Sequence, residues 1–126
     1  MNMLRLAIVL FLLGASANAG TEEIVKEFRG SGNEMTAIFK VDSPWLLDWR
    51  LDGDYDKLIA LDVTLIEAYT GRHVGLVLHT QRKGNGLKLF NEGGSYQLRI
   101  SSTLARWTFK IKQIEPEDAK LYTPRQ

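Results

Sequence analysis

The alternation of apolar and polar residues along most of the chain is the feature that most constrains its fold. In an extended strand successive side chains point to opposite faces, so a period of two predicts strands that are buried on one side. Eight short stretches follow this pattern, and glycine-rich polar turns separate them. They are Ile24–Arg29, Met35–Val41, Trp45–Leu51, Ile59–Leu65, Val74–Leu78, Leu87–Leu89, Tyr96–Ile100 and Trp107–Ile111.

The spacing of these stretches predicts an all-β fold. Short strands at this interval are typical of an antiparallel β-sandwich, with a jelly-roll or an immunoglobulin-like strand order. One local alternative exists, because Ser43 and Pro44 could cap a helix that carries Trp45 and Trp49 on one face. Such a helix would stop after two turns, so the strand is favoured. Only the stretch from Pro116 is expected to form a helical turn.

Residues 1–19 have the features of a secretory signal peptide. Arg5 precedes the apolar run Leu6–Leu13, and small residues at Ala17 and Ala19 suit signal peptidase. The run is much shorter than the ~20 residues that span a bilayer. We expect cleavage after Ala19 and export to the periplasm or beyond. Residues 20–126 should then form a single β-sandwich domain with a frayed C-terminal end.

Charge and cysteine content narrow the classes of function. The chain has 16 basic and 15 acidic residues, and Arg5 is the only charged residue of the signal segment, so the exported part is neutral. Binders of nucleic acid or anionic membranes normally carry a basic excess, so we expect neither partner. No further apolar stretch is long enough for a membrane span. The chain has no cysteine, so a packed core must stabilise it.

Three aspartates, Asp52, Asp54 and Asp56, alternate directly after a predicted strand. Carboxylates at this spacing can offer several oxygen ligands to Ca²⁺ from one loop. The loop is not an EF-hand, because Lys57 and Val63 occupy the positions of the required glycine and glutamate. A solvated turn is the favoured interpretation, and a calcium site at the three aspartates is the alternative. No other cofactor is expected.

The tryptophans Trp45, Trp49 and Trp107 are the candidate ligand-binding aromatic residues. Trp45 and Trp49 would lie ~13 Å apart on one face of a strand, a distance that suits a glycan. Leu47 and Leu51 share this face, however, and a continuous apolar row is what a sandwich core needs. Burial in the core is therefore favoured over a sugar-binding platform.

Catalysis has little support in the sequence. His73 and His79 are the only histidines, and they would lie ~20 Å apart on one strand, too far to share a zinc ion. No serine lies in a Gly-x-Ser-x-Gly motif. We therefore expect a protein that is not an enzyme, with a small hydrolase as the third choice of function.

Two segments, GSGNEMTAIFKVDSPWLLDWRL and GSYQLRISSTLARWTFKI, carry a resemblance to known proteins. The stretch from Gly30 to Ile111 resembles small secreted bacterial domains and is similar to the pre-peptidase C-terminal (PPC-like) domains. The resemblance implies a non-catalytic accessory β-sandwich of a kind that often tolerates calcium or binds a ligand. The chain lacks the second acidic cluster of the calcium-binding versions, so no functional residue is transferred.

The charged turns favour a protein partner. Arg82, Lys83 and Lys88 surround a glycine-rich hairpin tip, and the Asp52–Asp56 turn has the opposite charge. Separate charged tips would orient the molecule against a charged partner. We predict a non-catalytic binding or accessory protein whose loops bind another envelope protein, as an inhibitor or immunity-type partner of an exported enzyme. A glycan- or calcium-binding module is the alternative.

Overall fold

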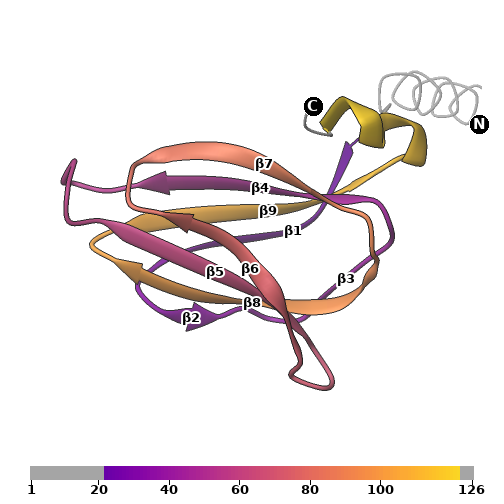
Figure 1. The fold of residues 1–126 in the computed structure, drawn as a ribbon, viewed down its shortest axis with the longest axis horizontal. Helices are drawn as coiled ribbons and strands as arrows, with labels where there is room; N and C mark the ends of the chain where they lie inside the picture. The colour runs from indigo at the N-terminus through magenta and orange to yellow at the C-terminus, as the bar shows by residue number, and fades with distance from the viewer. Residues whose placement is uncertain (1–21, 123–126) are drawn as a thin grey trace, which may run out of the picture.

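The structure is a computed structural model that describes residues 22–122 as two antiparallel sheets packed face to face (Figure 1). The elements are β1 (Glu22–Ser31), β2 (Glu34–Met35), β3 (Phe39–Val41), β4 (Trp45–Asp52), β5 (Ala60–Glu67), β6 (His73–Thr80), β7 (Gly84–Phe90), β8 (Gly94–Thr103), β9 (Arg106–Ile114) and the 3₁₀ helix η1 (Pro116–Tyr122). The predicted antiparallel β-sandwich is confirmed. The predicted signal peptide, residues 1–19, and the C-terminal residues 123–126 lie outside the described residues.

The strand order decides between the two topologies that the sequence left open. Sheet A has the order β1-β9-β4-β7, and sheet B has the order β2-β8-β5-β6, with β3 also paired to β8. Within these sheets β1 pairs with β9, β2 and β3 with β8, β4 with β7, and β5 with β6. The chain is thus one long hairpin rolled into two sheets, which is a jelly roll.

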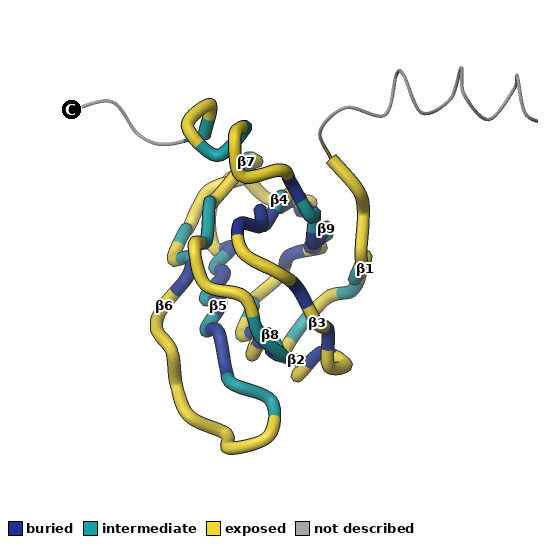
Figure 2. Tube along the Cα trace, turned by 90° about the vertical axis from the view of Figure 1, so that its right-hand side faces the viewer, coloured by how far each residue is buried: buried dark blue, intermediate teal, exposed yellow. Residues whose placement is uncertain are grey.

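The buried residues lie between the sheets (Figure 2), and the core that they form is rich in aromatic rings. Trp45 and Trp107 are 0% and 1% exposed. The Trp45 ring stacks on Phe90 with centroids 4.3 Å apart, and its Nε1 donates to the Glu92 carbonyl at 2.8 Å. Trp107 Nε1 donates to the Gly32 carbonyl at 3.1 Å. Burial with a satisfied N–H is stable, and the core interpretation of these two tryptophans is confirmed.

The strand predicted over Met35–Val41 is interrupted, so that β2 and β3 are separate. The alternation of the predicted strand Met35–Val41 would direct Met35 and Phe39 inward and Thr36 outward. Thr36 is instead 3% exposed, and its hydroxyl accepts a hydrogen bond from the Leu98 N–H at 2.9 Å. The Leu98 N–H thus donates to a side-chain hydroxyl and not to a backbone carbonyl of the neighbouring strand. The alternation of inward and outward side chains is broken at Thr36. Met35, predicted to point inward, is 43% exposed, whereas Phe39 is buried as predicted.

The alternation of the predicted strand Val74–Leu78 would direct Val74, Leu76 and Leu78 inward, but two register shifts between β5 and β6 overturn part of this row. The pairing with β5 skips Val77, which becomes an extra, buried residue, and also skips Val74, which is exposed. An extra residue in one strand turns the side chains before it to the other face. Val74 and Leu76 are therefore 41% and 62% exposed, while Leu78 packs against the core. The predictions for Val74 and Leu76 were wrong.

Gly30 lets β1 pass close to the buried ring of Trp107. The two residues are partners in the pairing of β1 with β9. A Cβ at Gly30 would lie 2.8 Å from both Cη2 and Cζ2 of the indole, which is closer than real Cβ contacts. The edge of sheet A therefore requires a residue without a side chain at this position.

We expect Gly30→Ala to lower the free energy of unfolding by about 1–3 kcal/mol, because the methyl group would displace a fully buried ring. Gly84→Ala is the matched control, since the nearest atom to its Cβ lies 3.9 Å away on Trp49, and its effect should stay within about 0.5 kcal/mol. Urea unfolding followed by fluorescence measures both variants. Equal stability of the two would contradict the packing of Gly30 against Trp107.

Candidate functional site

The outer face of sheet A contains a shallow, solvent-open hollow of about 1110 Å³. Its basic and acidic lining residues are Arg29, Arg50, Arg106, Lys110 and Lys112, and Asp48 and Asp52. Three further carboxylates lie beside these residues, because Glu27 pairs with Arg29, Asp54 with Arg106 and Glu22 with Lys112. The charges of the hollow are therefore largely balanced, and any attraction for anions depends on the cations that make no ion pair, Arg50 and Lys110.

The strand register places four polar residues of the hollow in one row across sheet A. Thr108 of β9 lies opposite Arg29 of β1 and opposite Arg50 of β4, and Arg50 lies opposite Asn85 of β7. Neighbouring strands are ~4.8 Å apart, and all four side chains line the hollow. The row therefore presents two guanidinium groups, a hydroxyl and an amide on one surface.

Thr108 lies at the centre of a cross of four basic residues, which we call the Thr108 cross. Arg29 and Arg50 flank it across the strands, and Arg106 and Lys110 flank it along β9 at the same-face spacing of ~6.8 Å. These residues come from three strands that are far apart in the sequence. The pairing of β9 with both β1 and β4 brings them together (Figure 1).

Two cations of the Thr108 cross, Arg50 and Lys110, make no direct ion pair among the described residues. Carboxylates lie near both, since Arg50 helps to lower the pKa of Asp52, and Glu27 and Asp48 lie opposite Lys110. Arg29 forms an ion pair with Glu27 of its own strand. Within residues 22–122, Arg50 and Lys110 make no ion pair with any acidic residue. Their charges are the ones that an external anion would compensate.

The aspartates considered as calcium ligands lie beside the hollow and face basic side chains. Arg106 is 3.1 Å from Asp54 and 3.8 Å from Asp52, and Lys83 is 3.3 Å from Asp56. A hydrogen bond from the next backbone N–H, together with the nearby Arg106, lowers the pKa of Asp52. Within residues 22–122 no three acidic or histidine side chains form a group that could hold a metal ion. The calcium site stays a prediction.

The residues expected to bind a partner through the hairpin tip point in different directions. Lys83 pairs with Asp56, so the basic tip touches the acidic turn, and the expectation of separate charged tips was wrong. Lys88 is directed to the edge between the sheets, where it donates to the Val77 carbonyl at 3.0 Å. Arg82 stays exposed at the tip. The three residues therefore present no common surface.

Among the three tryptophans, all within residues 22–122, Trp49 alone is not fully buried. It shares the inward face of β4 with the residues of the core, but it lies beside the edge strand β7. Gly86 makes room for it, because a Cβ there would be 2.7 Å from Trp49 Nε1. Trp45 and Trp107 offer no ring face to a ligand, so the glycan hypothesis rests on Trp49.

The structure also brings together a histidine and a carboxylate that the sequence analysis did not connect. Asp62 and His79 lie opposite each other on the outer face of sheet B, and His79 Nδ1 is hydrogen-bonded to the carboxylate. Ser101 lies on the other side of Asp62, so the carboxylate separates the hydroxyl from the imidazole. A serine nucleophile needs the imidazole next to it. In the sequence, Asp62 and His79 both fall at outward positions of consecutive strands, and this was the available signal that they share a face.

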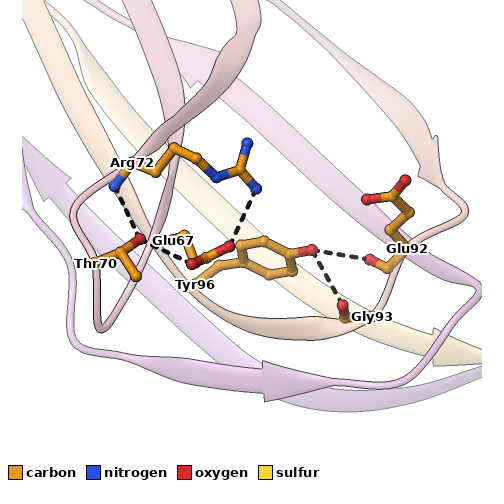
Figure 3. Close-up of polar contacts among 6 residues, drawn as sticks. All are labelled: Glu67, Thr70, Arg72, Glu92, Gly93 and Tyr96. Atoms are coloured by element: carbon orange, nitrogen blue, oxygen red, sulfur yellow. Dashed lines mark hydrogen bonds and ion pairs between the residues drawn. The ribbon is translucent and has the colours of Figure 1, made fainter.

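A polar cluster at one end of the sandwich has a structural role (Figure 3). The Thr70 hydroxyl and the Arg72 guanidinium donate to the Glu67 carboxylate at 2.8 and 3.1 Å and lower its pKa. The Tyr96 hydroxyl donates to the Glu92 carbonyl at 3.2 Å, and burial raises the pKa of Tyr96. These bonds fix the turn between β5 and β6 and the connection between β7 and β8.

An ion-pair network ties Lys112, at the margin of the hollow, to the start of β1 and to η1. Lys112 Nζ lies 3.0 Å from Asp48 and 3.2 Å from Glu22, and the Tyr122 hydroxyl donates to Glu22 at 2.7 Å. Desolvation opposes the charge of Lys112, but its hydrogen bonds to the two carboxylates outweigh this effect and raise its pKa. The hydrogen bond from Tyr122, aided by Lys112, lowers the pKa of Glu22.

Comparison of the chain with known protein families and with curated protein sequences finds no match. The resemblance to the pre-peptidase C-terminal domains therefore stays a prediction. Residues 22–122 contain no helix long and apolar enough to cross a membrane. The function must be inferred from the side chains of the site.

We expect Tyr122→Phe to reduce stability at neutral pH but not in acid. The Tyr122 hydroxyl holds the pKa of Glu22 below its usual 4.5, so this stabilisation is present above that pH and is lost as the pH falls through the folded-state pKa. Because the pair is largely solvent-exposed, the loss at about pH 7 should be below about 1 kcal/mol. Urea unfolding from about pH 7 to about pH 3 measures it.

Tyr69→Phe, at a ring that is 80% exposed, is the control for this pH series and should match the wild-type protein throughout. A stability difference between Tyr122→Phe and wild type that does not change with pH would contradict the role of the Glu22 carboxylate.

We expect acrylamide to quench the emission of Trp49 selectively, because Trp45 and Trp107 are at most 1% exposed. Trp49→Phe should lose most of the quenchable emission, and Tyr55→Phe should quench like the wild-type protein. Quenching of Trp49→Phe to the wild-type extent would contradict the burial of the other two rings. Oligosaccharides that leave Trp49 emission unchanged would argue against the glycan hypothesis.

Proposed function

We propose that this chain is an exported, non-catalytic binding protein that holds another protein of the cell envelope through the hollow of sheet A. The observation that carries the proposal is the local positive field of Arg50 and Lys110, the two cations of the hollow that make no ion pair within residues 22–122, whereas its other basic residues are paired. A positive field of this kind steers an acidic partner to the surface and orients it.

The geometry of the surface supports binding better than the hairpin tip does. The hollow is formed by four paired strands, which hold their side chains in a fixed register. Arg50 and Lys110 have no ion pair within residues 22–122, whereas Lys83 and Lys88 already contact other parts of the chain. The proposal keeps the predicted protein partner and moves its binding surface from the loops to the sheet.

Three observations favour this function over the alternatives. Export is supported by the signal-peptide pattern of residues 1–19. A glycan site needs exposed rings, and the tryptophan that lines the hollow, Trp107, is 1% exposed. The pair of Asp62 and His79 lies on sheet B, away from the hollow. An inhibitor or immunity-type partner of an exported enzyme fits a small binding protein of this kind.

We expect affinity purification with the tagged protein to recover a stoichiometric partner from envelope extract. Arg50→Glu with Lys110→Glu should reduce recovery at least about tenfold, because both unpaired cations of the hollow are reversed. Arg82→Glu with Lys83→Glu changes charge equally at the hairpin tip and is the matched control. It should retain the partner. Thermal unfolding of each variant checks that it is folded.

Equal loss of the partner in both double variants, or loss in the tip variant alone, would contradict binding through the hollow. Recovery should also fall with increasing salt concentration, since exposed charges separated by more than ~10 Å are screened at about 0.1 M salt.

A further inference from the structure

The Thr108 cross has the composition of a site for a single carboxylate. We propose that Thr108 receives one aspartate or glutamate side chain of the partner, and that the hollow selects an isolated acidic residue flanked by basic ones. This inference rests on the proposed function, because it names the group by which the protein partner is held.

Thr108 supplies a hydrogen-bond donor at the centre of the hollow. Its neighbours in β9, Trp107 and Phe109, are 1% and 0% exposed in the core, so the Thr108 side chain points to the outer face. Within residues 22–122 the Thr108 hydroxyl has no hydrogen-bond partner. Hydroxyl groups readily donate to carboxylate oxygens, so the group is available to an anion in the hollow.

Arg29 and Arg50 flank this hydroxyl; Arg29 is paired with Glu27, so Arg50 is the guanidinium group that makes no ion pair within residues 22–122 and suits a planar anion. Each lies one strand away from Thr108, at ~4.8 Å between strands. A guanidinium group binds a carboxylate through two parallel N–H donors, which gives direction as well as charge. Lys110, two residues after Thr108 in β9 and on the same face, adds a second positive charge that makes no direct ion pair within residues 22–122.

The acidic residues around the cross limit the charge of the ligand. Glu27 and Asp48 lie opposite Lys110 on its two sides, and Asp52 lies opposite Arg106. A polyanionic chain would extend toward these carboxylates and be repelled, and the carboxylates would repel a dianionic phosphate more strongly than a singly charged carboxylate. A monoanionic carboxylate avoids them, and basic residues on either side of it would pair with them. The surface is therefore complementary to a segment in which one acidic residue is flanked by lysine or arginine.

Titration of the purified, ¹⁵N-labelled protein tests the inference. The probes are an acetylated Lys-Gly-Glu-Gly-Lys amide, the same peptide with glutamine in place of glutamate, and inorganic phosphate. We expect the glutamate peptide to shift the Thr108 amide and the Arg50 Nε–H resonances saturably, with affinity at least about tenfold above the glutamine peptide. Thr108→Val should weaken it about fivefold, and Arg50→Gln should weaken it more.

Arg82→Gln is the matched control and should bind the glutamate peptide as the wild-type protein does. Equal affinity for the two peptides, or a stronger response of Thr108 to phosphate than to the glutamate peptide, would overturn the carboxylate site. If these results occur while the Arg50 and Lys110 double variant still loses the partner, the proposed function stands and this inference falls. If the protein binds the glutamate peptide selectively but holds its partner through the hairpin tip, the carboxylate site stands and the proposed function falls.

Discussion

The two-residue period of β9 is the constraint on which both the core and the hollow depend. β9 is paired on both edges, with β1 and with β4. Trp107 and Phe109 point into the core, where they are 1% and 0% exposed, and Arg106, Thr108 and Lys110 point to the outer face. A slip of one residue would exchange the two rows. Burial of a large apolar side chain contributes about 1.5–3 kcal/mol, so the core residues hold Thr108 in its position.

The jelly-roll topology explains why the charged face is assembled from distant parts of the chain. The first and last strands pair directly, which places Arg29 beside Thr108, and the roll brings β4 to the other edge of β9. The ion pairs at the margin of the hollow include that of Lys112 with Glu22, whose side chains are partly buried. Their effect is to compensate the outer charges, which leaves Arg50 and Lys110 as the basic residues of the hollow without a direct ion pair within residues 22–122.

The candidate site was much harder to predict from the sequence than the fold. Arg82, Lys83 and Lys88 attracted attention because they are neighbours in the sequence, but contacts made after folding use two of them. Arg29 and Arg50 are far apart in the sequence and meet only through β9. The polar outward row of the last predicted strand was the only local signal of the hollow. Sequence spacing indicates the face on which a residue lies, but not the strand that will lie beside it.

The sequence by itself determined the strands, most of their inward faces and the burial of Trp45 and Trp107, because alternation is a local property of the extended chain. Tertiary structure decided the jelly-roll order, the inward turn of Thr36 and the extra residue Val77 in β6. It also decided that two arginines meet across Thr108. These features depend on which strands pair and in which register, and that choice is made by long-range packing and hydrogen bonding.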